Sequence, residues 1–184
     1  MTRKHSDIGL ILQAAHFSAD KHRDQRRKGF RNTPYINHPL EVAERVQRIG
    51  GIEDAEILAA AILHDTIEDT QTSLDELTRL FGRRIAGLVA ELTVENQGIH
   101  WADRKRNEID DAPHLSPDAK LIKLSDKTSN VADTVENPPS EWTLQRRRDY
   151  LEFARLVADG CHGVNAALDA EFDRVHAAAL RKLR

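Results

Sequence analysis

The sequence has a single cysteine, Cys161, which excludes an intramolecular disulfide and any metal site built from paired cysteines. It has no signal-peptide pattern and no apolar run of about 18 residues or more, so we expect no membrane span and a cytoplasmic protein. It also lacks an excess of basic charge. With 30 Asp and Glu against 27 Lys and Arg, the formal net charge is −3, which argues against a role in coating nucleic acid.

The apolar residues that are present recur at helical spacing, and no stretch alternates convincingly with a period of two. The chain of 184 residues, 40% hydrophobic and 31% charged, suits one globular domain with a sizeable core. We therefore expect a single all-α domain over residues 1–184. The predicted helices cover residues 8–19, 39–49, 54–65, 74–81, 85–92, 103–110, 117–136, 141–159 and 164–183. The segments 25–37 and 93–102 have little apolar pattern and are predicted to be loops.

Three helix starts carry capping signals. Ser6 is placed to cap the first helix, and Ser116 followed by Pro117 fits an N-cap and first helical residue. Ser73 with Glu76 three residues later has the pattern of a capping box.

The stretch 62–69, ILHDTIED, places imidazole and carboxylate groups where a buried helix should end, directly after the apolar run 57–61. Burying a carboxylate without a partner is costly, so something must compensate these groups. Adjacent residues on a helix point about 100° apart, so His64 and Asp65 can share an ion only if it sits beside the helix. Further ligands would then have to come from other segments.

Two polar residues elsewhere could supply those ligands. His38 stands before a proline at a predicted loop–helix junction, and Asp126 lies in an otherwise apolar helical segment. Taken singly, His38 could be a capping residue, and Asp126 could pair with an arginine or face water. One divalent cation would instead compensate His38, Asp126, His64 and Asp65 together. A site of two imidazoles and two carboxylates is compatible with Mn²⁺, Fe²⁺ or Zn²⁺.

Four segments of the chain closely resemble the hydrolase domain of RelA/SpoT proteins, within the HD metal-dependent phosphohydrolases. They are KHRDQRRK at 21–28, TPYINHP at 33–39, LHDTIEDT at 63–70 and KLIKLSDK at 120–127. The order of His38, His64, Asp65 and Asp126 is the H…HD…D pattern of that family. The length is similar to that of the stand-alone small alarmone hydrolases, in which no synthetase domain follows.

The resemblance implies a fold of about ten helices and a Mn²⁺ ion held by these four residues. It implies hydrolysis of ppGpp or pppGpp to GDP or GTP and pyrophosphate, through a water activated by the metal. The activation of that water falls to Glu68 and Asp69, one turn beyond the HD pair, where a carboxylate could take its proton. For Asp69, capping of the turn before Thr70 is the alternative.

A substrate with several negative charges needs cations around it, and the resemblance assigns nucleotide contacts to Arg27, Lys28, Asn130 and Tyr150. Spacings of three or four residues let Lys123 share a helix face with Asp126 and Asn130. The alternatives are a solvated helix end for the basic run at 23–28 and a core position for Tyr150. Arg104, Lys105 and Arg106 could also reach in from the neighbouring loop.

The chain departs from the resemblance at Ser129, where relatives often have an aromatic or other large residue, and at Val94-Glu95-Asn96, where they tend to have paired acids. Both departures are expected to lie near the nucleotide, which leaves the substrate open. An HD phosphohydrolase for another nucleotide, such as an NADPH 2′-phosphatase, is one alternative, and a non-catalytic nucleotide sensor is another. Glu68 and Asp69 speak against the sensor. We expect a small-molecule nucleotide as partner, neither nucleic acid nor membrane, and a homodimer as a candidate assembly.

Overall fold

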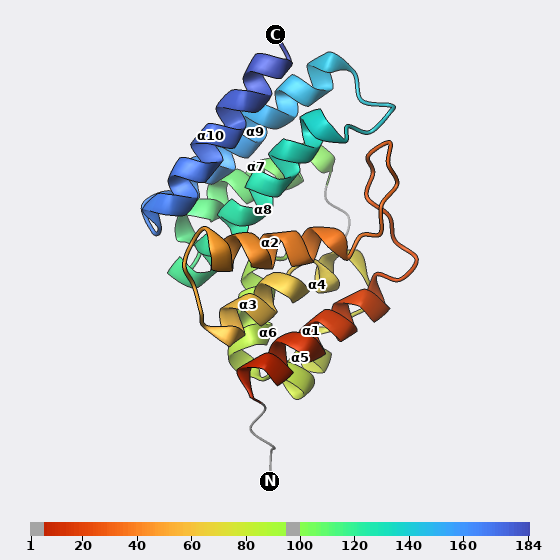
Figure 1. Ribbon diagram of the computed structural model, residues 1–184, viewed down its shortest axis with the longest axis vertical. Coiled ribbons are helices and arrows are strands. Elements are labelled where there is room, and N and C mark those ends of the chain that lie inside the picture. Colours follow the sequence, from red (N-terminus) through yellow and green to blue (C-terminus); the bar gives the residue numbers. More distant parts are fainter. Residues whose placement is uncertain (1–5, 95–99) are drawn as a thin grey trace.

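The computed structural model describes residues 6–94 and 100–184, and within them the chain is all-α, as predicted (Figure 1). Apart from one isolated bridge between Arg26 and Pro34, the described residues form no β-structure. The helices are α1 (Asp7–Lys21), α2 (Asn37–Arg48), α3 (Ala55–Leu63), α4 (Thr66–Asp69), α5 (Leu74–Phe81), α6 (Arg83–Leu92), α7 (Trp101–Asp111), the 3₁₀ turn η1 (Ala112–His114), α8 (Pro117–Glu136), α9 (Leu144–Cys161) and α10 (Ala166–Lys182).

The predicted caps of α1 and α8 are confirmed, because Ser6 Oγ accepts from Gly9 N at 3.1 Å and Ser116 Oγ accepts from Ala119 N at 3.3 Å. The capping box at the start of α5 is only half formed. Ser73 Oγ accepts from the backbone of Glu76, but the Glu76 carboxylate binds Lys21 Nζ at 3.0 Å instead of returning to Ser73.

The predicted helix 54–65 ends two residues early. Helix α3 ends at Leu63, His64 and Asp65 form a turn, and α4 begins at Thr66. The Thr66 hydroxyl donates to the Leu63 carbonyl at 2.7 Å across this break. Both His64 and Asp65 keep right-handed helical backbone angles at this turn.

Five helix starts differ from the predictions by two or three residues. Helices α2 and α6 begin two residues early, at Asn37 and Arg83, without a side-chain cap, and the other three starts are set by a capping side chain. Helix α7 begins at Trp101, two residues early, with His100 as its cap. Helix α9 begins at Leu144, three residues later than predicted, with Thr143 as its cap. Helix α10 begins at Ala166, two residues later than predicted, with Asn165 as its cap. Histidine is not a usual N-cap residue, so the sequence carries no clear signal for the start of α7.

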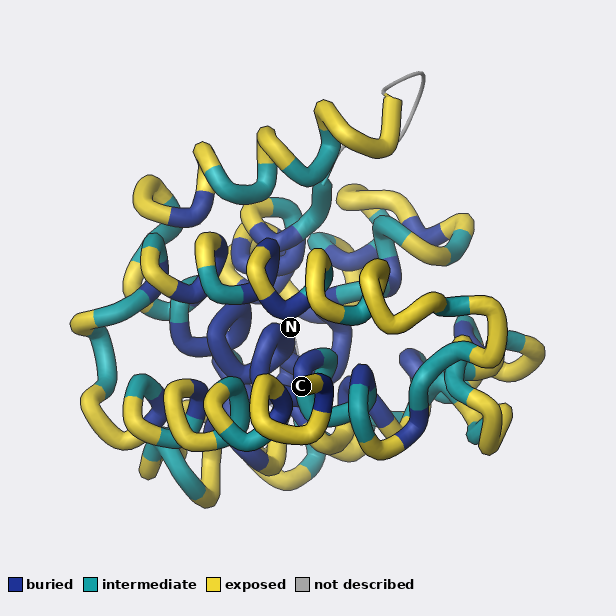
Figure 2. Tube along the Cα trace, turned by 90° about the horizontal axis from the view of Figure 1, so that it is seen from above, coloured by how far each residue is buried: buried dark blue, intermediate teal, exposed yellow. Residues whose placement is uncertain are grey.

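The helices surround two apolar clusters. One is built by α1, α2, α3, α5 and α6, and the other by α8, α9 and α10 with the end of α7. Helix α8 serves both, because Ile122 faces the first cluster while Leu124 faces the second. Figure 2 shows the buried segments gathered at the centre of the molecule. Helix α3 is almost entirely buried. Helices α2 and α8 pack together at the seam between the two halves (Figure 1). None of the described helices has both the length and the apolar character needed to cross a bilayer.

Candidate metal centre and active site

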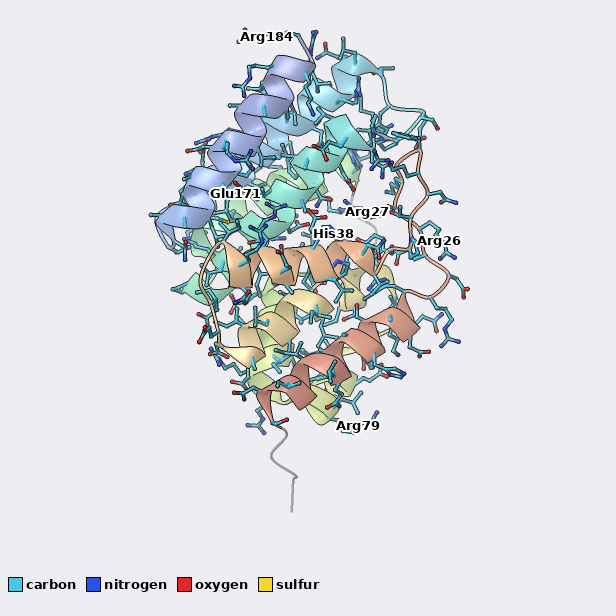
Figure 3. All side chains as sticks on the ribbon, in the orientation of Figure 1. Arg26, Arg27, His38, Arg79, Glu171 and Arg184 are labelled. Atoms are coloured by element: carbon cyan, nitrogen blue, oxygen red, sulfur yellow. The ribbon has the colours of Figure 1, made fainter. Side chains whose placement is uncertain are left out.

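Four polar side chains from three separate elements meet at the seam between the two halves. His38 comes from the first turn of α2, His64 and Asp65 from the break between α3 and α4, and Asp126 from α8. His38, His64 and Asp126 are each less than 10% exposed. Figure 3 shows His38 at the N-terminal end of α2, with Arg27 close by.

The Nε2 atoms of the two histidines lie 3.0–3.9 Å from the nearest oxygens of the two carboxylates. His38 Nε2 is 3.1 Å from Asp126 Oδ1 and 3.7 Å from Asp65 Oδ2. His64 Nε2 is 3.0 Å from Asp65 Oδ2 and 3.9 Å from Asp126 Oδ1. Ligand atoms about 2.1 Å from one ion would be roughly 3.0–3.5 Å apart, close to these separations. His38, His64 and Asp65 alone already form a group that could hold a metal ion.

The outer nitrogens of both imidazoles are hydrogen-bonded, which directs the Nε2 atoms inward. His64 Nδ1 donates to the Ala61 carbonyl at 2.8 Å, and His38 Nδ1 lies 3.2 Å from Ser129 Oγ. Metal-binding histidines commonly have such outer partners, which fix the ring orientation. His64 Nε2 is buried and lies 3.0 Å from Asp65 Oδ2, but not in the geometry of a hydrogen bond. A cation at the centre would bind this nitrogen and the carboxylate together.

The electrostatics of the group also favour a cation. Burial alone would lower the pKa of His64, but Asp65 and Asp126 raise it to about 9. Burial would raise the pKa values of the two carboxyls, yet His64 holds that of Asp65 and Lys127 holds that of Asp126 well below their usual range. Two ionised carboxylates in a buried site thus attract positive charge strongly enough to retain a proton on His64. Since two imidazoles and two carboxylates suit a divalent transition metal, the residues present fit the implied ion.

Two neighbouring side chains orient the carboxylates. The Tyr35 hydroxyl donates to Asp65 Oδ2 at 2.7 Å, and Asn130 Nδ2 donates to Asp126 Oδ1 at 2.5 Å. Lys127 Nζ lies 3.3 Å from the other Asp126 oxygen. The sequence did not single out Tyr35, although its place three residues before His38 is a signal that could have found it.

Glu68 and Asp69 project from α4 into the cavity next to the metal ligands. Glu68 accepts from the backbone of Val94 and from Arg104, both at 3.3 Å, and burial together with Asp65 raises its pKa. Asp69 is exposed and accepts from Gln25 Nε2 at 2.8 Å. Its described hydrogen bond therefore goes to a side chain on the other wall of the cavity and not to a helix end.

The cavity that holds these groups has a volume of about 390 Å³. Aromatic residues are scarce in the chain, yet both tryptophans and both tyrosines line it, together with Phe153. Lys105 Nζ lies 4.3 Å from the Trp101 ring centroid and 4.4 Å from that of Phe153. The lining also holds eight basic residues: Arg26, Arg27, Lys28, Arg104, Lys105, Lys123, Lys127 and Arg146. A cavity of this size with such walls fits a nucleotide that carries several phosphates.

All five predicted substrate-binding residues line this cavity: Arg27, Lys28, Lys123, Asn130 and Tyr150. These residues differ in their exposure and in their hydrogen-bond partners. Arg27 is held by Asp133, with Nε and Nη2 at 2.9 and 2.7 Å from one carboxylate oxygen, whereas Lys28 is exposed. Lys123 Nζ is bound to the Leu92 carbonyl at 3.1 Å and lies 3.3 Å from Glu108, so it is less available than its helix position suggested.

The other residues that were expected near the nucleotide only partly line the cavity. Arg104 and Lys105 line it but Arg106 does not, and Arg23 pairs with Asp20 on the surface. Ser129 is absent from the lining, and its hydroxyl faces His38. Of the second departure, Val94 lines the cavity, while Glu95 and Asn96 lie outside the described residues.

Several cavity residues carry no clear sequence signal. Gln25 and Glu108 look like ordinary surface residues, and only the tertiary structure brings them to Asp69 and to the lysines of α8. Trp142 and Arg146 lie within the predicted helix 141–159, and the Arg146 guanidinium lies 4.9 Å from the Trp142 ring centroid in the cavity lining.

Comparison with known proteins agrees with this geometry. A family described as an HD domain matches residues 14–158. Guanosine-3′,5′-bis(diphosphate) 3′-pyrophosphohydrolase MESH1 of Xenopus tropicalis is 44% identical over 170 residues, which cover 92% of this chain and 94% of the relative. The human protein of the same name is 44% identical over 164 residues, 89% of this chain and 91% of its own length.

A solved structure described as a metazoan ortholog of SpoT that hydrolyzes ppGpp superposes with a TM-score of 0.88 at 38% sequence identity. The match covers 92% of this chain and 94% of that structure. A second solved structure, lmo0812 from Listeria monocytogenes, has a TM-score of 0.61 at 25% identity and covers 79% of this chain and 97% of its own. The chain belongs to the HD-domain family and, within it, to the stand-alone SpoT relatives that include MESH1.

Proposed function

We propose that this protein is a metal-dependent guanosine-3′,5′-bis(diphosphate) 3′-pyrophosphohydrolase, which converts ppGpp or pppGpp to GDP or GTP and pyrophosphate. The observation that carries the proposal is the buried Nε2 of His64, which lies 3.0 Å from Asp65 and 3.9 Å from Asp126 in a cavity with eight basic side chains. Two relatives named for this reaction match this chain over 94% and 91% of their own length, which supports the same activity.

We assign His38, His64, Asp65 and Asp126 as the ligands, and Mn²⁺ as the ion. A divalent ion at this position would polarise a phosphoryl oxygen and lower the pKa of a nearby water. The choice of Mn²⁺ depends on the family resemblance, since the general affinity order favours Zn²⁺.

Glu68 is the proposed general base. Its carboxylate lies in the cavity near Asp65, and burial raises its pKa, so it can accept a proton more readily than a solvated carboxylate. The water it deprotonates attacks the phosphorus bonded to O3′. The P–O3′ bond breaks, the new oxygen leaves with the pyrophosphate, and O3′ takes a proton to become the hydroxyl of the nucleoside. Asp69, held by Gln25, is proposed to orient the same water.

The basic and aromatic walls are proposed to hold the substrate. Arg27 and Lys28 enter from the loop before α2, and Lys123 and Asn130 from α8, on the side of the metal ligands. Tyr150 and its aromatic neighbours, Trp142 just before α9 and Phe153 on α9, offer rings against which a base or ribose can stack. Because elements from both halves complete this cavity, we treat residues 1–184 as one catalytic domain. We place its reaction on a free nucleotide, in the cytoplasm, without nucleic acid or membrane as a partner.

A parallel assay tests the proposal. The purified protein with Mn²⁺ is incubated separately with ppGpp, pppGpp and NADPH in ¹⁸O-labelled water, and the products are separated and weighed. We expect pyrophosphate carrying one ¹⁸O from both guanosine substrates, and unlabelled GDP or GTP. Phosphate release from NADPH alone would identify an HD phosphohydrolase for another nucleotide. Binding of ppGpp without any product would identify a sensor.

A further inference from the structure

The buried hydroxyls of α8 show one exception to a common pattern. Ser125, Thr128 and Thr134 each donate to the backbone carbonyl four residues earlier, at 2.9, 2.7 and 2.9 Å. This is the usual way for a hydroxyl inside a helix to satisfy itself. Ser129 is as buried as these neighbours, but its described hydrogen bond goes across the seam to Nδ1 of His38 on α2, at 3.2 Å.

The two histidines of the metal centre therefore have different kinds of outer partner. His64 Nδ1 faces a carbonyl, which can only accept, so this nitrogen always carries its proton. His38 Nδ1 faces a hydroxyl, which can donate or accept. The outer partner thus fixes the tautomer of His64 but leaves both tautomers of His38 open.

The inner side of His38 shows why this freedom is useful. Its Nε2 lies 3.1 Å from Asp126 Oδ1, within hydrogen-bonding distance of a carboxylate that can only accept. Without an ion, a neutral His38 ring is best satisfied with the proton on Nε2, donating to Asp126. A metal ligand must offer a lone pair at Nε2, so the ring proton then has to be on Nδ1.

We propose that Ser129 is a positioning residue for His38, whose hydroxyl reverses its hydrogen bond when the metal binds. In the metal-free protein Ser129 donates to Nδ1, while Nε2–H donates to Asp126. In the loaded protein Nδ1–H donates to Ser129 Oγ, and Nε2 binds the ion. The proton changes place on the ring, and neither state leaves a buried ring nitrogen of His38 without a partner. This inference rests on the metal site of the proposed function.

Paired serine variants test the proposal through metal affinity. Ser129→Ala removes the partner of His38, whereas Ser125→Ala, one turn away on the same helix and equally buried, removes only a bond to the Leu121 carbonyl. Loss of an outer partner typically weakens metal binding by about 10–100-fold. Calorimetric titration of the metal-free proteins with Mn²⁺ should therefore show about tenfold or greater weakening for S129A and little change for S125A.

A second measurement needs no variant and so does not depend on the folding of S129A. In ¹⁵N-labelled wild-type protein, the imidazole nitrogen shifts report which nitrogen carries the proton, and Zn²⁺ serves as a diamagnetic probe. We expect His38 to change from the Nε2–H to the Nδ1–H form on titration with Zn²⁺, and His64 Nδ1 to keep its proton throughout.

The outcomes distinguish the proposed role of Ser129 from the proposed metal site on which it rests. If wild-type protein binds neither Mn²⁺ nor Zn²⁺ at His38, the proposed metal site itself is wrong. If it binds both ions but S129A binds Mn²⁺ as tightly as S125A does, Ser129 has no positioning role. A His38 ring that already holds its proton on Nδ1 without metal would likewise overturn the reversal.

Discussion

The hydroxyl of Tyr35 donates a 2.7 Å hydrogen bond to Asp65 Oδ2, the oxygen that lies 3.0 Å from His64 Nε2. The ring of Tyr35 is itself fixed, with the His22 ring 4.9 Å away on one side and the Arg27 guanidinium 5.7 Å from its centroid. A residue from the loop before α2 thereby orients a carboxylate from the break after α3.

Tyr35→Phe should weaken metal binding by about tenfold or more, because Asp65 loses the donor that directs its oxygen toward the centre. Titration of the metal-free protein with Mn²⁺ measures the effect. Tyr150→Phe is the matched control: it removes a hydroxyl from the same cavity, but one that has no described bond to a metal ligand. Equal affinities for the two variants would contradict a role for Tyr35 at the metal centre.

Glu68→Gln should reduce kcat for ppGpp by about 10²–10⁴-fold, because the amide cannot accept the proton of the attacking water. Metal content measured on the same samples should stay at the wild-type level, since Glu68 is not a proposed ligand. Asp69→Asn should cost less, because Asp69 is exposed and already bound to Gln25. A larger loss of kcat in D69N than in E68Q would transfer the role of base to Asp69.

Arg27→Ala and Lys28→Ala should both raise KM for ppGpp, since a charge-assisted contact contributes about 1.5–3 kcal/mol, or about 10–100-fold. The two should differ in stability. Arg27 is largely buried against Asp133, so its loss also lowers the free energy of unfolding, whereas Lys28 is exposed and its removal should change stability by about 0.5 kcal/mol or less. Arg23→Ala, which breaks only a surface pair with Asp20, should leave KM unchanged. A rise in KM for R23A equal to that of R27A would show that the effect is not local to the cavity.

Glu108 should stabilise the fold only while it is ionised. Burial would raise the pKa of this carboxyl, but Lys127 and Lys123, at 2.6 and 3.3 Å, hold it below the ordinary 4.5. A depressed pKa contributes stability that is present above the unfolded value, near pH 4.5, and lost as the pH falls through the folded value.

Glu108→Gln should accordingly lower the free energy of unfolding by about 3 kcal/mol at pH 7, because two buried ammonium groups lose their shared partner. Urea unfolding of the metal-free proteins measures this loss, which should shrink at pH values below 4.5. Glu152→Gln, at an exposed position of α9, is the control. If the free energies of unfolding of E108Q and wild type differ by the same amount at pH 7 and pH 3.5, the stabilisation does not come from an ionised Glu108.

Much of the fold and of the metal centre could be predicted from local patterns. The helices follow from apolar periodicity and from Ser or Pro signals at their starts, as with Ser6 and Pro117. His38, His64, Asp65 and Asp126 stand out because each is a polar group in an apolar or constrained setting, and their need for compensation does not depend on knowing the fold.

What could not be predicted depends on contacts between distant segments. One local feature also carried no signal: α3 ends after Leu63, where the Thr66 hydroxyl donates to the Leu63 carbonyl. The contact between Ser129 and Nδ1 of His38 has no sequence signal, because it depends on how α8 packs against α2. Glu108 has no pattern of its own and acquires its role only because α7 packs over the lysines of α8.

The most direct measurement is pyrophosphate release from ppGpp by the metal-free protein as Mn²⁺ is added. Wild-type protein should be inactive at first and gain activity in proportion to added metal, with saturation at one ion per chain, while Asp126→Ala should bind no stoichiometric ion and remain inactive. Full activity before any metal is added, or an Asp126→Ala protein that binds and responds to Mn²⁺ as the wild type does, would contradict the proposed metal-dependent hydrolase.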